Sequence, residues 1–298
     1  MQWSGTPDDF GNRTLSATHT LHQHPLFTDA GLIRLLDLYP RDQIGLWTFP
    51  PHREGHLPPV RGDIGQTPSQ DILEAVKNGF IWLNLRNSNH YLTEMKEIAD
   101  LIFGSIRDTF NVKVLMPDAS VLISSPNVSV NYHLDIPMVC LVHLRGEKHM
   151  WLYPSDEVHA PSEHIQNVIL KKSEEELTFR KAYDASATKY ILQPGDALTW
   201  PQSAPHRIQN GRDINVSLSC EYMTIETLLL ANAMYTNGLM RTKLGLNPRR
   251  ARKLNPSTLA KVAVARVAKT IRPPRSAQQV TPPTFRIDLD TETCTAPL

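Results

Sequence analysis

The spacing of hydrophobic positions changes along this chain. Up to about residue 109, apolar residues recur every three to four positions, most clearly over residues 30–39, 69–77 and 91–110. This spacing is typical of helices that bury one face, and Ser69 is placed to cap the second of them. Prolines are paired within residues 50–52 and 57–62, where they exclude a helix or a central strand. We therefore expect three helices, with an irregular connection between the first two.

From residue 120 onward the hydrophobic period becomes two, which is the period of a strand. Turn residues such as Arg145-Gly146, Pro194-Gly195-Asp196 and Asn210-Gly211 separate the strand segments. The segments are residues 120–125, 128–135, 138–144, 149–153, 189–192, 197–200, 206–209 and 214–222. Eight short strands at this density predict a mainly β fold with flanking helices, built on a jelly-roll or cupin barrel.

The remaining segments complete a four-part organisation. Residues 1–110 are expected to form a helical and irregular region that packs on the barrel, and residues 111–225 the barrel itself. Within the barrel, the long polar stretch 155–187 is expected to be a functional insertion or to carry its own helix. Helical patterns return at 227–240 and 256–271, so residues 226–272 should form basic helices. Residues 273–298, rich in Pro, Thr and Gln, are expected to be a flexible tail.

Composition and charge bound the protein class. The 298 residues are 41% hydrophobic and 20% charged, which suits a globular protein with a substantial core. The net charge of +1 gives no bulk attraction to nucleic acid or to an acidic membrane. Three widely spaced cysteines suggest no disulfide framework, and neither a signal peptide nor a membrane-spanning run is evident. We expect a cytoplasmic protein that makes no membrane contact.

Candidate metal ligands fall within the strand region. His133 and Asp135 are two positions apart, so both side chains leave the same face if this segment is extended. His206 follows a Pro-Gly-Asp turn and a short apolar strand, and can approach from across the barrel. Two histidines and one carboxylate form the facial triad of non-haem Fe(II) sites, which leaves positions open for a co-substrate and oxygen. His-x-Asp by itself is common, and a half-exposed polar strand explains that pair equally well.

Three further motifs carry a family resemblance. Residues 132–137 (Tyr-His-Leu-Asp-Ile-Pro), 144–154 (Leu-Arg-Gly-Glu-Lys-His-Met-Trp-Leu-Tyr-Pro) and 192–206, with Pro-Gly-Asp near its start and Pro-His at its end, occur in that order. This arrangement resembles the core of the cupin-like JmjC family of Fe(II)- and 2-oxoglutarate-dependent oxygenases, over residues 128–222. The resemblance implies a double-stranded β-helix, with Fe(II) held by His133, Asp135 and His206. It also implies 2-oxoglutarate and O2 as co-substrates.

The resemblance implies that Lys148 pairs with the distal carboxylate of 2-oxoglutarate. A buried dianion needs a cation at that end, although a lysine in a solvent-exposed hairpin is the alternative reading. Many relatives carry a hydroxyl residue and an asparagine where this chain has Val130 and Val139. The second anchor for the co-substrate is therefore open. The candidates are Tyr132, Asn131 and Ser217, and strand parity does not show which of them points inward.

The implied activity is that of a dioxygenase, most simply a hydroxylase of a protein or peptide side chain or of a small metabolite. The same step on an N-methyl group would give demethylation. A non-catalytic cupin that binds a ligand or metal as a sensor or scaffold is the alternative, and a non-oxidative cupin isomerase is a third. Lysines and arginines gather between residues 241 and 275. We do not favour nucleic acid as their partner, because a solvated or subunit-pairing helix explains them. Relatives often dimerise through helices after the barrel, so we expect a homodimer.

Overall fold

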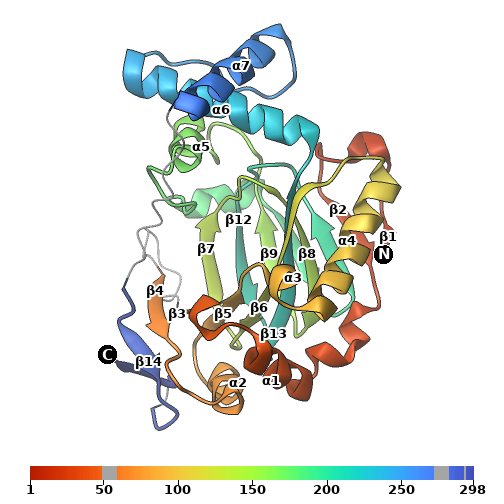
Figure 1. Cartoon of the computed structure of the whole chain (residues 1–298), viewed down its shortest axis with the longest axis vertical. Coiled ribbons are helices and arrows are strands. Elements are labelled where there is room, and N and C mark those ends of the chain that lie inside the picture. Colours follow the sequence, from red (N-terminus) through yellow and green to blue (C-terminus); the bar gives the residue numbers. More distant parts are fainter. Residues whose placement is uncertain (49–58, 272–281, 292) are drawn as a thin grey trace.

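All eight strands expected from the period-two pattern are present. The computed structural model describes residues 1–48, 59–271, 282–291 and 293–298 (Figure 1). The strands are β6 (Leu115–Ser124), β7 (Ser129–His133), β8 (Met138–Arg145), β9 (Lys148–Leu152), β10 (Thr188–Leu192), β11 (Asp196–Thr199), β12 (His206–Asn210) and β13 (Asn215–Met223).

These strands divide between two sheets that face each other. In the larger sheet β11, β8, β13 and β6 are neighbours in that order, and in the smaller sheet the order is β10-β9-β12-β7. Following the chain, β6, β8, β11 and β13 belong to the larger sheet and β7, β9, β10 and β12 to the smaller one. The chain thus passes back and forth between the sheets, with only β9 and β10 consecutive in one sheet, which is the winding of a double-stranded β-helix. The expected mainly β, cupin-type fold with flanking helices is confirmed.

The period of two places alternate residues of the larger sheet in two different cores. Its outer face, with Val121 and Leu218, packs in the largest hydrophobic core, to which α1 (Asp29–Leu38), α2 (Ser69–Asn78) and α4 (Thr93–Phe110) contribute. Its inner face, with Leu141, packs against Met150 and Ile208 of the smaller sheet inside the barrel. Burial of both faces fixes the register of each strand, because a slip of one residue would exchange the two faces.

The three expected N-terminal helices are present, and α3 (Ser88–Tyr91) precedes the third. Ser69 does not cap α2, since it is the first helical residue and Pro68 precedes it. Residues 1–110 also contribute five strands that we did not expect. They are β1 (Gln2–Trp3), β2 (Leu15–Thr18), β3 (Ile44–Thr48), β4 (Val60–Asp63) and β5 (Trp82–Leu85). Each spans two to five residues, and helices interrupt the series, so the sequence shows no continuous run of strand segments there.

These five strands extend the larger sheet on both sides of the barrel strands. Residues 60–62, which we expected to be irregular, lie in β4, whereas residues 50–52 and 57–58 are outside the described residues. Short 3-10 helices, none expected, connect the elements. They are η1 (Pro7–Asp9), η2 (Leu21–Gln23), η3 (Pro25–Phe27), η4 (Arg41–Gln43) and η5 (Lys181–Ser186).

Two segments add helices at one end of the barrel. The insertion 155–187 carries α5 (Ser162–Ile169), so the expectation of a helix there is confirmed. After the barrel, α6 (Ile225–Leu244) is capped by Thr224, whose side chain accepts a hydrogen bond from the Thr227 amide. The last helix, α7 (Pro256–Ile271), packs along α6, and Figure 1 shows α5, α6 and α7 together. No helix in the described ranges is long and apolar enough to cross a membrane.

The C-terminal residues differ from the flexible tail that we expected. β14 (Phe285–Ile287) pairs in parallel with β4, and β15 (Thr295–Pro297) pairs with β14, so the described part of the tail forms the edge of the larger sheet. Phe285 is buried against Gly62, where an added Cβ would lie 2.5 Å from the Phe285 ring. Residues 273–281, which precede this edge, are outside the described residues.

Phe285→Ala should lower the free energy of unfolding by roughly 3 kcal/mol, because it removes a buried aromatic side chain from the sheet edge. Arg286→Ala is the matched control, since Arg286 is exposed on the same strand and its removal should cost less than about 0.5 kcal/mol. Urea denaturation of both variants measures the difference. Equal stabilities would mean that the tail is not part of the folded sheet.

Candidate metal centre

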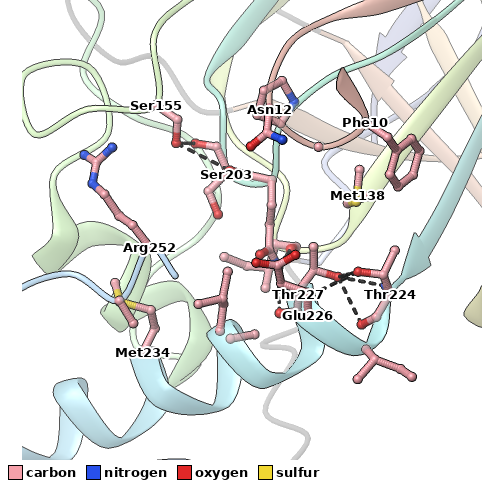
Figure 2. Close-up of a pocket in the computed structure, with 18 of the residues that line it drawn as sticks. Phe10, Asn12, Met138, Ser155, Ser203, Thr224, Glu226, Thr227, Met234 and Arg252 are labelled. Carbon is pink, nitrogen blue, oxygen red and sulfur yellow. Dashed lines mark hydrogen bonds between the residues drawn. The ribbon is translucent and has the colours of Figure 1, made fainter. Parts of the chain in front are cut away.

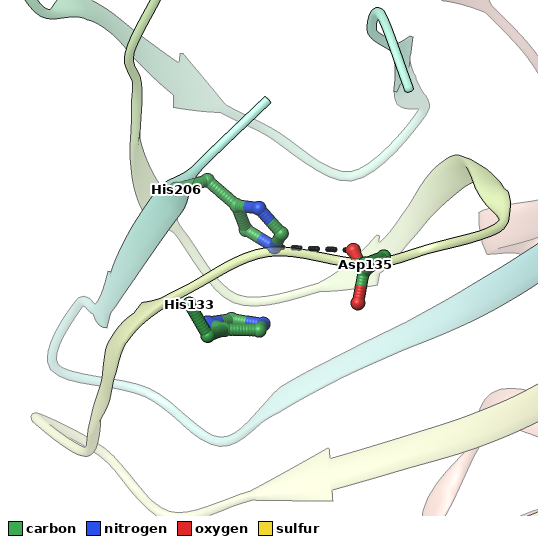
Figure 3. A group of neighbouring side chains, drawn as sticks. All are labelled: His133, Asp135 and His206. Atoms are coloured by element: carbon green, nitrogen blue, oxygen red, sulfur yellow. Dashed lines mark ion pairs between the residues drawn. The ribbon is translucent and has the colours of Figure 1, made fainter. Parts of the chain in front are cut away.

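Strand pairing brings the two predicted histidine ligands together. His133 is the last residue of β7 and His206 the first of β12, and the two are direct partners in the small sheet. Their ring centroids are 4.1 Å apart. Asp135 lies two residues beyond β7, and its Oδ2 is 3.6 Å from Nε2 of His206 (Figure 3). One ligand atom from each of the three residues lies within 4.8 Å of the others, so the predicted triad converges.

A bulge in β7 orients the first ligand. His206 pairs with His133 and Ile208 pairs with Val130, so β7 has one residue more than β12 over this stretch. In a regular strand, Val130 and His133 would point to opposite faces. The extra residue allows Val130 to pack in the barrel core while His133 joins the triad on the same side. The side chain of Tyr132, between them, packs in a separate core outside the barrel.

Backbone carbonyls orient both imidazoles. Nδ1 of His133 lies 2.7 Å from the carbonyl oxygen of Asn131, and Nδ1 of His206 lies 3.4 Å from that of Ala204. A carbonyl oxygen only accepts, so each Nδ1 carries the proton and each Nε2 keeps its lone pair for a metal. Burial is the main effect that lowers the pKa of His206 well below its usual value, and the nearby His133 lowers it further. That imidazole is therefore neutral, as a metal ligand must be.

Among the described residues, no lysine or arginine forms an ion pair with the carboxylate of the triad. Burial raises the pKa of Asp135 above its usual value, and the neighbouring His133 only partly opposes this effect. A largely enclosed carboxylate next to two imidazoles is stabilised when a divalent cation binds among them. The chemistry of this donor set therefore fits a metal ion.

Lys148 lies in the same barrel interior and is buried, with 4% of its surface exposed. Its Nζ donates a hydrogen bond to Oδ1 of Asn210 at 3.2 Å, and no carboxylate of the described residues lies within ion-pair distance of it. Burial lowers the pKa of Lys148 to about 8. The alternative of a solvent-exposed hairpin lysine is excluded. A buried cation with only a neutral acceptor is costly, so this position suits an anionic ligand.

The register of β9 against β12 relates this lysine to the metal ligands. Lys148 pairs with Asn210, and Leu152 pairs with His206. The two pairs are four residues apart along the strands and face the same side, which separates their Cα atoms by roughly 13 Å. The candidate metal centre and the buried ammonium group therefore lie at the two ends of one interior.

The three candidates for a second anchor of 2-oxoglutarate lie in three different environments. Tyr132 points away from the barrel, and its hydroxyl donates to the carbonyl of His159. Asn131 lies in the bulge, where its carbonyl orients His133. Ser217 is buried within the barrel, and its hydroxyl lies 3.0 Å from Nδ1 of His143. Burial and then the charge of Lys148 lower the pKa of His143 to about 3. Of the three candidates, Ser217 is the one whose contacts lie near the lysine.

Two polar residues of the interior were not predicted. Asn210 was interpreted as a turn residue, yet it ends β12 and accepts from Lys148. Glu221 lies on β13, and its pKa is raised to about 7 by burial and then by the charges of Asp135 and Asp118. The strand period could have identified Glu221, since it is four residues from Ser217 and shares its face.

A cavity of about 610 Å³ lies next to the metal centre without including its ligands. Figure 2 shows the first turn of α6, with Thr224 and Thr227, below the N-terminal residues Phe10 and Asn12. Ile136, which follows Asp135, and Gln202, which precedes His206 by four residues, also line it. The cavity therefore shares two wall segments with the metal centre.

No model of a known protein family matches the chain, and no curated protein matches it. Among solved structures, it is similar to ycfD of Escherichia coli at 16% identity, over 92% of this chain and 70% of that one, with a TM-score of 0.51. The two chains share a fold. A second structure, of YcfD as a ribosomal oxygenase with cobalt and 2-oxoglutarate, matches at 15% identity over 91% and 68%, with a TM-score of 0.49. The likeness to ycfD agrees with the cupin-type fold predicted from the sequence.

Lys148→Met should stabilise the ligand-free protein by about 2 kcal/mol at pH 7, since methionine fills a similar volume without a buried charge. The pKa of Lys148 is about 8 in the folded chain and higher in the unfolded chain, so the unfolded state binds more protons between these values. The free energy of unfolding of the wild type should therefore rise with pH between these two pKa values. The difference in free energy of unfolding between the variant and the wild type should become smaller over the same range. Urea unfolding from pH 7 to 10 measures both curves. A less stable variant would show that Lys148 supports the fold.

Proposed function

We propose that this protein is an Fe(II)- and 2-oxoglutarate-dependent dioxygenase that uses O2 to hydroxylate its substrate. The observation that carries the proposal is the buried Lys148, which faces the same interior as the ligand triad and has no carboxylate partner in the part of the chain that the structure describes. A metal triad by itself fits several divalent ions. An unpaired ammonium group further along the same interior adds a requirement for an anion, which 2-oxoglutarate satisfies with its distal carboxylate.

The residues present fit both groups. His133, Asp135 and His206 would hold Fe(II) and leave its other positions for the 2-oxo acid and O2. When bound, Fe(II) and 2-oxoglutarate supply the oxidising power that places a hydroxyl group on an unactivated carbon, with succinate and CO2 as by-products. The chain itself orients the reactants and limits water, through the apolar barrel interior that includes Met150 and Ile208.

The distal end of the co-substrate site departs from the family pattern. Val130 packs inside the barrel where relatives offer a hydroxyl, and Val139 is paired with Glu221 where relatives offer an asparagine. Lys148 with Asn210 supports an anchor of one cation and one amide, and Ser217 is the hydroxyl whose contacts lie close to them. We infer that these three residues hold the distal carboxylate.

The decisive assay is succinate release from 2-oxoglutarate by anaerobically purified, Fe(II)-loaded protein after air is admitted, with a panel of peptides and metabolites. The wild type should release succinate, and His133→Ala should release none because a metal ligand is lost. Lys148→Met should retain metal binding and raise the KM for 2-oxoglutarate at least tenfold, since a buried charge-assisted contact is removed.

Two other results would contradict the dioxygenase proposal and favour a different function. Tight metal binding with neither 2-oxoglutarate binding nor turnover would favour a sensor or scaffold. Conversion of a substrate without 2-oxoglutarate would favour a cupin isomerase.

We propose a protein or peptide side chain as the substrate, with a small metabolite as the second candidate. The E. coli protein that shares the fold is described as a ribosomal oxygenase, which supports the first class. In the assay, mass spectrometry of the peptide panel should show the gain of one oxygen atom. Loss of a methyl group instead would assign demethylation.

We further propose a homodimer that forms through the helices after the barrel. Several apolar side chains on or next to α6 and α7 are exposed, and they are Leu244, Leu246, Leu254, Leu259, Val264, Val267 and Ile271. Val264, Val267 and Ile271 follow helical spacing and form one stripe on α7, away from the face that α6 covers.

Sedimentation should give twice the 33.6 kDa chain mass, and Val264→Glu with Val267→Glu should give a folded monomer, because two charges enter the apolar stripe. Arg266→Glu, exposed between them, is the charge control and should remain dimeric. A wild type that is monomeric at micromolar concentration would contradict the proposal.

We also place the protein in the cytoplasm. Cys140 and Cys220 face each other across β8 and β13, and both are buried free thiols, as is Cys294. Neighbouring unlinked thiols support a reducing compartment.

A further inference from the structure

The segment that carries Asp135 has little backbone support of its own. β7 ends at His133 and β8 begins at Met138, so Asp135 lies in an irregular connection outside the sheet ladders. Pro137, within this connection, has no backbone N–H to donate. A ligand on such a segment holds its position only if other parts of the chain fix the backbone on either side of it.

Two hydrogen bonds flank the ligand. Before Asp135, the amide of Leu134 donates to the carbonyl of Glu175 at 3.1 Å. After it, the carbonyl of Ile136 accepts from Nε2 of Gln202 at 2.8 Å. The second bond comes from a side chain, so substitution can remove it without changing a backbone ladder.

Gln202 connects the segment that carries Asp135 with the loop that precedes His206. It precedes the ligand His206 by four residues, and the same Nε2 donates to the carbonyl of Thr227 in the first turn of α6 at 3.2 Å. Sδ of Met223, a weaker acceptor, lies 3.8 Å from the same Nε2, so the two carbonyl oxygens are the main acceptors of its two hydrogens. The backbone of its loop is held in turn, since the hydroxyl of Ser155 donates to the carbonyl of Ser203 at 3.2 Å and accepts from Arg250 at 2.7 Å.

We propose that Gln202 is a positioning residue of the metal centre, which fixes the Asp135 connection relative to the His206 loop and to α6. The proposal rests on the metal site of the proposed function and adds a residue that touches no ligand atom. Its amide matters as a donor of two hydrogen bonds, so a side chain of the same shape without N–H should not replace it. Loss of the tether widens the range of positions open to Asp135, which weakens the metal rather than the barrel.

The test is a titration of the wild type, Gln202→Met and Gln202→Glu with Co(II). The visible absorption of the bound ion reports both the Kd and the geometry of the site. Gln202→Met removes both donors with little change of volume and should weaken the Co(II) Kd roughly tenfold, with an altered spectrum. Gln202→Glu should weaken it further, because a carboxylate would face two carbonyl oxygens.

Thr224→Ala separates positioning from plain destabilisation. It removes the cap of α6, and with it a hydrogen bond to the amide of Thr227, without touching Ile136. We expect it to lower Tm by a few degrees and leave the Co(II) Kd and spectrum unchanged. An unchanged Kd in Gln202→Met, or an equal loss of affinity in Thr224→Ala, would overturn the positioning role alone. Failure of the wild type to bind Co(II), or equal binding by His133→Ala, would overturn the proposed function together with it.

Discussion

The register of β12 is the constraint on which the interior of this protein depends. β12 is hydrogen-bonded to β7 on one side, which places His206 against His133, and to β9 on the other, which places Asn210 against Lys148. One strand thus sets both the metal end and the lysine end of the barrel interior. A slip of one residue would turn His206 and Asn210 outward together. Ile208, between them, packs in the barrel core and resists that slip.

The interior holds groups that a barrel built only for stability would not contain. Within the described residues, Asp135 is a largely enclosed carboxylate without a Lys or Arg partner, and Lys148 is a buried cation without a carboxylate partner. They lie at the two ends of one space. Each is unfavourable in the ligand-free chain. A divalent ion would compensate the Asp135 carboxylate, and the distal carboxylate of 2-oxoglutarate would compensate the Lys148 ammonium group. A metal-bound 2-oxoglutarate that reaches from one end to the other therefore best explains the two opposite charges. The apolar cores on both faces of the larger sheet stabilise the fold and offset the unfavourable free energy of these two charges.

Much of this framework could be predicted from the sequence, because turn residues separate successive barrel strands and because the motifs keep a specific order. His133, Asp135 and His206 converge as expected. The route to that convergence was not predictable, since a bulge in β7 and an irregular connection place the first two ligands where a regular strand was assumed. Short N-terminal strands and the C-terminal edge gain their structure from pairing partners distant in sequence, which leaves no local period to detect. The contacts of Asn210 and Gln202 are likewise tertiary and carry no motif.

The most direct test of the account is a crystal structure of the protein grown without oxygen with Mn(II) and 2-oxoglutarate, with the metal located by anomalous scattering. We predict one metal ion bound by Nε2 of His133, Nε2 of His206 and the carboxylate of Asp135, with the 2-oxo acid end of the co-substrate on the metal. Its distal carboxylate should contact Lys148. A metal on other residues, or 2-oxoglutarate bound away from Lys148, would contradict the account.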